Sequence, residues 1–186
     1  MKMKGIITAL VTPFDEKGNI LEFALRKLCD FQLKKHVNGL LILGTTGEGI
    51  SIDLEERKLV AEIVVDELKG KLPVMVHVGS SNIKEVTSLT KHAVDIGADA
   101  ITSITPYFFK VSDKEIFDFY IELSKNVPND YPVYLYNFPN ATGNDISPQV
   151  LKKLIEEREN IVGIKYSSDN IMRMQEYLKL QSPNFK

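Results

Sequence analysis

Lys165 is the side chain whose type and setting could most readily do chemistry. It lies near the end of the apolar segment Ile161–Tyr166, which we expect to form a short buried strand. Burial disfavours the charged ammonium and lowers the pKa of a lysine from about 10.4, which frees the amine to attack carbonyl groups. A lysine in a strand can also extend its ammonium to solvent or pair with a carboxylate. This segment alone therefore leaves a catalytic and a structural lysine open.

A second group with chemical potential is the glycine-rich segment 44–49, which contains Thr45 and Thr46. It follows the apolar segment 39–43 directly, so we expect it at the end of a strand. A turn of this kind offers backbone N–H groups and two hydroxyls to an anion such as a carboxylate. The alternative is a tight turn that needs glycine for its backbone angles.

Tyr136 is the third candidate, because it ends the apolar segment 132–136. A phenol, with a pKa near about 10, can transfer protons to and from a carbinolamine when it lies beside an amine. On neighbouring strands of a barrel, Tyr136 and Lys165 would point at one pocket. The alternative is an aromatic side chain of the core.

Six apolar segments must position these groups, and each is followed by a segment with helical spacing. The apolar segments begin near residues 5, 39, 73, 100, 132 and 161. We expect helices over residues 21–36, 53–69, 82–96 and 113–126, and from residues 148 and 170 onward. A repeat of roughly thirty residues is the length of one βαβ unit, so strict alternation predicts an α/β fold with a parallel sheet. An open doubly wound sheet and most of a (β/α)8 barrel both fit, and both place chemistry at the carboxyl ends of the strands.

Composition excludes several classes of function. The chain has 186 residues with a formal net charge of -2 and no basic run, so we expect neither nucleic acid nor an anionic membrane as a partner. Its one cysteine, Cys29, fits a reducing compartment and a cytoplasmic protein. The three histidines, His36, His77 and His92, share no metal-like spacing, and we interpret them as structural, with His36 and His92 in helices.

Three motifs occur together in this chain: Gly44-Thr-Thr-Gly-Glu48, Tyr136-Asn-Phe-Pro139 and Gly163-Ile-Lys165. The opening Ile7-Thr-Ala-Leu-Val-Thr-Pro-Phe14 and the turn Thr105-Pro-Tyr107 accompany them. In order and separation, these motifs resemble those of the dihydrodipicolinate synthase/N-acetylneuraminate lyase family of class I aldolases. The resemblance covers the whole chain.

The resemblance implies a (β/α)8 TIM barrel, in which Lys165 forms a Schiff base with pyruvate or another 2-oxo acid. Tyr136 would be the proton-transfer tyrosine. Thr45, Thr46 and Gly47 would bind the substrate carboxylate, and Thr46 would also take part in the proton relay. The protonated imine withdraws electrons from the adjacent carbon, so an enamine can form and attack an aldehyde, or the reverse. No metal or organic cofactor is required, and the full-length form is expected to be a homo-oligomer, a dimer or a tetramer.

The aldehyde partner is the point on which family members differ. Dihydrodipicolinate synthases usually have an arginine where this chain has Ala141, and a second tyrosine where it has Phe108. The segment 136–143 is more similar to 2-keto-3-deoxygluconate aldolases, and Ser167 resembles a hydroxyl residue of the sugar-acid lyases. The resemblance therefore favours a sugar-acid aldolase first and a dihydrodipicolinate synthase second.

Only about six of the eight β/α units are present, and a seventh strand should begin near Phe185. We therefore expect residues 1–186 to be a single incomplete TIM-barrel domain, a fragment that needs its remainder from elsewhere. Its first and sixth strands would then be exposed edges. Two alternatives to the aldolase stay open: a catalytically silent scaffold that binds a 2-oxo acid, and a nucleotide-binding open sheet. The second is disfavoured because the glycine turn follows the second strand and lacks the usual spacing.

Overall fold

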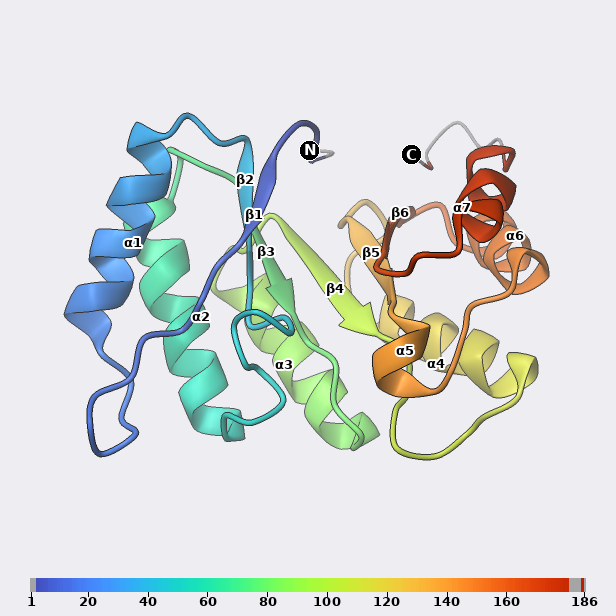
Figure 1. The fold of residues 1–186 in the computed structure, drawn as a ribbon, viewed down its shortest axis with the longest axis horizontal. Coiled ribbons are helices and arrows are strands. Elements are labelled where there is room, and N and C mark those ends of the chain that lie inside the picture. Colours follow the sequence, from blue (N-terminus) through green and yellow to red (C-terminus); the bar gives the residue numbers. More distant parts are fainter. Residues whose placement is uncertain (1–2, 181–184, 186) are drawn as a thin grey trace. The chain divides into compact units, whose positions relative to one another are not determined.

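The computed structural model describes residues 3–180 and 185, and its strands and helices alternate along the chain, except that two consecutive helices precede the last strand (Figure 1). In order, the elements are β1 (Ile7–Ala9), α1 (Glu22–Lys34), β2 (Gly39–Ile42), α2 (Leu54–Leu68), β3 (Val74–His77), α3 (Ile83–Asp95), β4 (Ala100–Ile104), α4 (Asp113–Lys125), β5 (Val133–Asn137), α5 (Pro139–Thr142), α6 (Pro148–Glu157), β6 (Ile161–Tyr166) and α7 (Ile171–Leu178).

The six strands form one sheet whose order is the order of the chain, β1-β2-β3-β4-β5-β6. The pairs β1–β2, β2–β3 and β5–β6 are parallel. A doubly wound sheet reverses its strand order at a switch point, whereas a (β/α)8 barrel adds its strands in sequence. The structure thus confirms the predicted barrel fold, with six of its eight β/α units.

Contacts divide the chain into two compact units. Unit 1 contains the described residues up to Val78 together with Lys91–Ile101, and unit 2 contains Gly79–Thr90 and the described residues from Thr102 onward. Strand β4 contributes residues to both units. The single domain over residues 1–186 stays a prediction.

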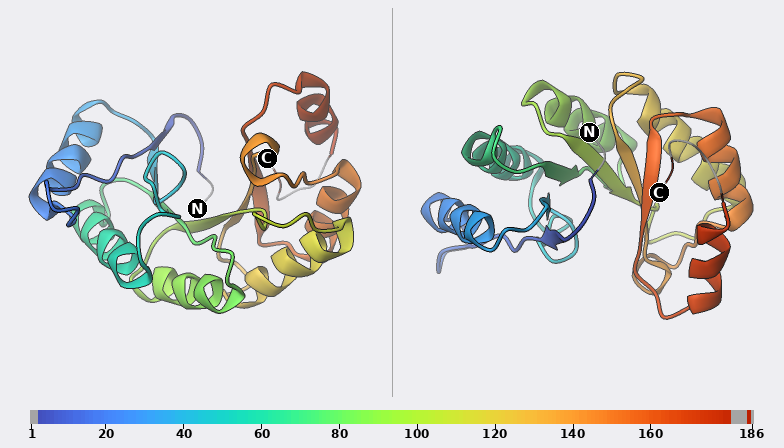
Figure 2. Two further views of the ribbon diagram at one scale, coloured as in Figure 1. Left: turned by 60° about the horizontal axis from the view of Figure 1, so that its bottom comes forward. Right: turned by 90° about the horizontal axis from the view of Figure 1, so that it is seen from above.

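In unit 1, helices α1 and α2 lie side by side in every view (Figures 1 and 2) and pack on each other. Strands β2 and β3 are buried along their whole length, as expected for a parallel sheet covered by helices. Helix α2 begins where the Asp53 side chain accepts a hydrogen bond of 2.9 Å from the backbone N–H of Glu56. This cap fixes the helix start that the sequence indicates.

In unit 2, helices α4, α6 and α7 lie on the same side of β5 and β6 (Figure 2). Helix α6 starts at Pro148, as predicted, behind a cap formed by Ser147, and its apolar side chains are buried: Val150, Leu151, Leu154 and Ile155. Helix α4 starts with a capping box formed by Ser112 and Glu115. These helices hold β5 and β6, which carry two of the candidate residues.

Two expectations need correction. The uninterrupted apolar run of residues 5–11 predicts a strand buried on both faces, but β1 is only half-buried, because as the first strand of the sheet it has a neighbouring strand on one side only. His36 does not lie in a helix: α1 ends at Lys34, and His36 adopts a left-handed backbone with φ of 56° where the chain turns toward β2. The short helix α5 was not predicted, because its Pro-Asn-Ala-Thr sequence has no helical spacing to detect.

Candidate functional site

Tyr136 and Lys165 are neighbours across strands β5 and β6. They are register partners, and the Lys165 Nζ lies 3.8 Å from the centroid of the Tyr136 ring. The ring is buried, whereas Lys165 is half-buried rather than enclosed as its sequence setting suggested. An ammonium over an aromatic face is attracted by the ring quadrupole, so this contact orients the lysine side chain.

A bulge in strand β6 creates this pairing. Val133 pairs with Ile161, but the next residue, Tyr134, pairs with Gly163, so Val162 is an extra residue. A one-residue slip moves every side chain of a strand to the opposite face, and bulges occur next to active sites for this reason. Without the bulge Tyr136 would lie opposite Ile164, and the lysine would lose its aromatic partner.

Ser167 directly follows β6 and extends its pairing with β5. Its backbone N–H donates a hydrogen bond of 2.9 Å to the carbonyl oxygen of Asn137. The residue is half-buried and lies two positions after Lys165. Ser167 therefore belongs to the same end of the same strand pair as the lysine and the tyrosine.

The segment 44–49 forms a turn in unit 1, and it presents Thr45 and Thr46 at the surface. The Thr45 carbonyl accepts from the backbone N–H of Glu48, and the buried Gly47 carbonyl accepts a hydrogen bond of 2.7 Å from the Thr12 hydroxyl. The turn is therefore a fixed structure that exposes two adjacent threonines.

Two of the three glycines of this turn, Gly47 and Gly49, are needed for close packing, and none is needed for a left-handed backbone. None of the three has a positive φ; the left-handed residues are Leu43 and Glu48, with φ of 60° and 55°. A Cβ on Gly47 would lie 2.8 Å from the Leu43 nitrogen, and one on Gly49 would lie 1.9 Å from the Leu43 oxygen. A buried leucine in the left-handed region is strained, and such strain occurs at functional sites.

The structure thus brings three of the predicted site residues together in unit 2: Tyr136, Lys165 and Ser167. Thr45, Thr46 and Gly47 belong to unit 1. Assembly of the two groups into one site stays a prediction.

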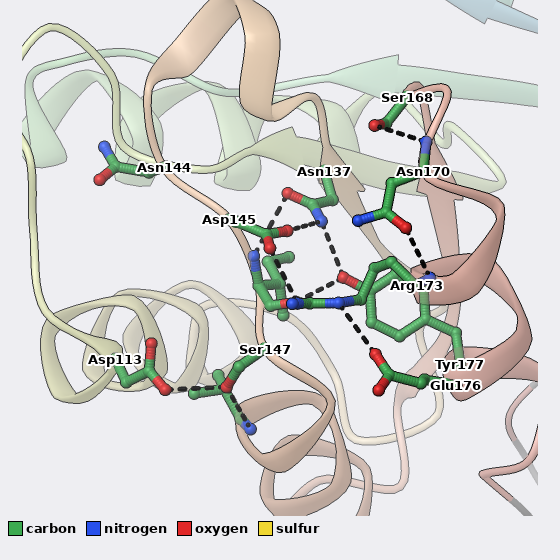
Figure 3. A network of polar contacts seen from close by, with 12 residues as sticks. Asp113, Asn137, Asn144, Asp145, Ser147, Ser168, Asn170, Arg173, Glu176 and Tyr177 are labelled. Atoms are coloured by element: carbon green, nitrogen blue, oxygen red, sulfur yellow. Dashed lines mark hydrogen bonds and ion pairs between the residues drawn. The ribbon is translucent and has the colours of Figure 1, made fainter.

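Sequence reasoning missed a polar network beside the strand ends, in which Asn137, Asp145, Arg173 and Tyr177 turn toward one another (Figure 3). The buried Asn137 amide donates to Asp145 Oδ1 at 2.7 Å and to the Tyr177 hydroxyl at 2.8 Å. The only available signal was Asn137 itself, the second residue of the Tyr-Asn-Phe-Pro motif.

The two positions at which the resemblance indicates a departure from dihydrodipicolinate synthases both lie at the surface. Phe108 is exposed in the loop after β4 and has a left-handed backbone with φ of 77°, and Ala141 is exposed in α5. The buried Asn144 holds this loop, because its amide donates to the carbonyls of Pro106 and Phe109, each at 2.8 Å. Neither departure leaves a gap in the core.

Within residues 3–180 and 185, no cluster of three or more His, Cys, Asp or Glu side chains is arranged to hold a metal ion. Across the same residues, no helix combines the length and the apolar character that crossing a membrane demands.

Chemically, an amine held over a phenol ring at the end of a parallel strand pair suits imine formation with a carbonyl compound. The amine supplies the nucleophile, and a phenol can take up or release the protons that carbinolamine formation and dehydration move. Chemistry at the carboxyl ends of the strands is also the rule for this fold.

The sequence matches the family described as "Dihydrodipicolinate synthetase family" over residues 2–186. Among curated proteins, the probable 2-dehydro-3-deoxy-D-pentonate aldolase YjhH of Escherichia coli K12 is 38% identical over 170 residues, which are 91% of this chain and 56% of the relative.

Solved structures agree in fold. Dihydrodipicolinate synthase from Aquifex aeolicus has a TM-score of 0.93 and 34% identity, covering 98% of this chain and 61% of that one. YagE of Escherichia coli K12, described as a member of the dihydrodipicolinic acid synthase family in complex with pyruvate, has a TM-score of 0.90 and 35% identity, covering 94% of this chain and 58% of that one. This chain thus spans 56% to 61% of the length of these three relatives.

Proposed function

The chain belongs to the dihydrodipicolinate synthetase family, and on this premise we propose that it carries the pyruvate-binding half of a class I aldolase. Lys165 is the nucleophile that forms a Schiff base with pyruvate. The observation that carries the proposal is the contact between Lys165 and the ring of Tyr136, at 3.8 Å from Nζ to the centroid. A protein described as bound to pyruvate shares the fold and supports this choice of ligand.

In the proposed mechanism, the neutral Lys165 amine attacks the carbonyl carbon of pyruvate and a carbinolamine forms. Tyr136 delivers the proton with which the hydroxyl leaves as water, and an imine results. The protonated imine draws electrons from the methyl carbon, which loses a proton to the Tyr136 phenolate to give an enamine. The enamine carbon then bonds to the aldehyde carbon, the aldehyde oxygen takes up the Tyr136 proton to become a hydroxyl, and the protonated imine is restored. Hydrolysis of this imine releases the product and the free lysine, and the reverse sequence cleaves the product.

The other predicted residues have binding roles in this proposal. The hydroxyls of Thr45 and Thr46 and the backbone at Gly47 bind the pyruvate carboxylate, and Thr46 also relays protons to Tyr136. Ser167 binds the substrate beside the lysine. Each role uses groups that the chain itself supplies, so the proposed reaction needs no metal or organic cofactor.

For the aldehyde, we propose a sugar-acid aldolase that acts on a 2-keto-3-deoxy acid such as 2-keto-3-deoxygluconate. The similarity to YjhH, named as a probable pentonate aldolase, supports this choice. Ala141 and Phe108 support it too, because neither side chain can bind a carboxylate or relay a proton. The second candidate is dihydrodipicolinate synthase, which condenses pyruvate with aspartate semialdehyde; it is supported by the similarity to the Aquifex aeolicus enzyme.

The test is to trap the imine with borohydride in the presence of pyruvate and to locate the adduct by peptide mapping. It is carried out on the polypeptide of residues 1–186 and on a full-length version. We expect one reduced pyruvyl adduct, on Lys165. The Lys165→Arg variant should lose it, and the Lys153→Arg variant, which changes an exposed lysine of the same unit, should retain it.

No adduct on the full-length protein would overturn the aldolase and favour the silent 2-oxo-acid-binding scaffold. An adduct on the full-length protein alone would mean that the polypeptide of residues 1–186 cannot assemble its site. A panel of glyceraldehyde, glycolaldehyde and aspartate semialdehyde then separates the two substrate classes. The predicted homo-oligomer is tested on the same full-length sample by sedimentation.

A further inference from the structure

The amide of Asn137 links the last residue of strand β5 to two other elements. Its nitrogen donates to Asp145 in the segment before α6 and to the hydroxyl of Tyr177 in α7. Its side-chain oxygen accepts from the backbone N–H of Ile146 at 3.3 Å. All of the amide's hydrogen bonds therefore hold the end of β5 to the segments that cover it.

Tyr177 is the buried centre of this network (Figure 3). Its hydroxyl accepts from Asn137 and donates a short hydrogen bond to the carbonyl of Ile146. Burial, followed by the nearby Asp145 carboxylate, raises the pKa of the Tyr177 hydroxyl above its ordinary value, so the group keeps its proton. Tyr177 thus acts as a fixed bridge between α7 and the end of β5.

Arg173 closes the network from the same helix. Its guanidinium bonds to Asp145 at 2.8 Å, to the Ile146 carbonyl at 3.1 Å and to Glu176 at 3.1 Å. Burial opposes the Arg173 charge, but Asp145, Tyr177 and Glu176 together raise its pKa above the ordinary value. Asp145 and the Ile146 carbonyl therefore each have a second partner besides Asn137 and Tyr177.

The network lies on the face of the strand pair opposite to the candidate catalytic residues. Side chains alternate along a strand, so Asn137 points away from the side that carries Tyr136, and Tyr166 points away from that of Lys165. Tyr166 packs edge-on against Tyr177, with ring centroids 5.2 Å apart. One tyrosine of α7 thus touches the residue after Tyr136 and the residue after Lys165.

We propose that Tyr177 is a positioning residue, which acts through Asn137 to hold the Lys165 amine over the Tyr136 ring. Asp145 and Arg173 support it by holding the same amide and carbonyl. The expected effect on pyruvate trapping rests on the proposed Schiff-base function, whereas the expected effect on the position of the Lys165 amine does not.

The test compares Tyr177→Phe with Tyr166→Phe, which removes a hydroxyl from the other ring of the same pair. The Tyr166 hydroxyl makes only an exposed contact of 3.4 Å to the Asn170 carbonyl. Tyr177→Phe leaves Asn137 bonded to Asp145 and the Ile146 carbonyl bonded to Arg173, so we expect it to fold. Circular dichroism and thermal melts establish the temperature at which all samples are folded.

At that temperature we expect Tyr177→Phe to slow pyruvate trapping by about tenfold, since small displacements of reacting groups cost large factors in rate. The pyruvate concentration that gives half the maximal rate should be unchanged, and Tyr166→Phe should stay within about twofold of the wild type. A conservative second variant, Asp145→Asn, should slow trapping by about threefold; it decides the question if Tyr177→Phe does not fold.

A second readout does not depend on activity. Lysines are methylated reductively with a 13C label, and the Lys165 signal, assigned with Lys165→Arg, should show the ring-current shift of a methylamine over an aromatic face. Tyr177→Phe should lose that shift and Tyr166→Phe should keep it. If Tyr177→Phe keeps both the trapping rate and the shift of the wild type, the positioning role is overturned. If the wild type forms no pyruvate adduct but Tyr177→Phe still loses the shift, the aldolase function is overturned and the positioning role stands.

Discussion

Lys165 and Cys29 are both nucleophiles by type, and their surroundings give them opposite properties. Lys165 is half-buried at a strand end, with its Nζ 3.8 Å from the centroid of a phenol ring. Cys29 is fully buried on the inner face of α1, and burial, with the carboxylates of Glu67 and Asp30, raises the pKa of its thiol to about 12. The thiolate is the reactive form of cysteine, so only the lysine is placed for chemistry.

The raised thiol pKa predicts a pH dependence of stability. The thiol holds its proton more tightly in the folded protein than in the unfolded one. Its contribution to the unfolding free energy is therefore complete below the unfolded pKa of about 8.5 and is lost as pH rises toward about 12. Between about pH 8 and about pH 10, we expect the wild type to lose about 2 kcal/mol more unfolding free energy than Cys29→Ala. Urea titrations under reducing conditions measure this, and parallel losses in both proteins would contradict the assignment.

At the scale of elements, two local irregularities set the candidate site. The bulge at Val162 places Lys165 opposite Tyr136, and the left-handed Leu43 turns the chain from β2 into the segment that exposes Thr45 and Thr46. The second irregularity depends on close approach between backbones. In the second, the carbonyl of Leu43 lies where a side chain on Gly49 would be.

The turn therefore predicts different tolerance at two glycines of the same segment. A Cβ on Gly49 would meet the Leu43 oxygen at 1.9 Å, whereas the nearest atom to a Cβ on Gly44 is a Leu41 methyl carbon at 3.8 Å. We expect Gly49→Ala to lower the unfolding free energy by about 3 kcal/mol or more and Gly44→Ala to change it by less than about 1 kcal/mol. Chemical denaturation of the two variants measures both; equal effects would mean that the turn adapts.

These irregularities are the part of the site that the sequence alone does not predict. The six β/α units, and Tyr136 and Lys165 at their strand ends, follow from hydrophobic period and from the rule that chemistry lies at the carboxyl ends of strands. The bulge and Leu43 do not, since periodicity carries no signal for one inserted residue or for a strained backbone. Tyr177 was missed because its partner Asn137 is 40 residues away in sequence, and no local pattern pairs them.

At the scale of the whole molecule, the described sheet has two end strands, β1 and β6. Strand β1 pairs with β2 on one side. Ile6, which directly precedes β1, is held by hydrogen bonds between its backbone and Asn38, and 69% of the surface of Ile6 is exposed. An apolar side chain next to the open side of an end strand favours pairing with another chain. We therefore expect the polypeptide of residues 1–186 to self-associate at micromolar concentration.

The Ile6→Lys variant tests whether this edge is responsible. A lysine at a sheet edge opposes pairing, because its charge would have to be desolvated between two strands. The matched control is Ile50→Lys, which introduces the same charge at an isoleucine of similar exposure, 60%, outside any strand. In sedimentation velocity over a concentration series, Ile6→Lys should remain monomeric at concentrations where the wild type and Ile50→Lys associate. If both variants associate as the wild type does, contact between chains uses another surface; if both are monomeric, added charge rather than the β1 edge controls association.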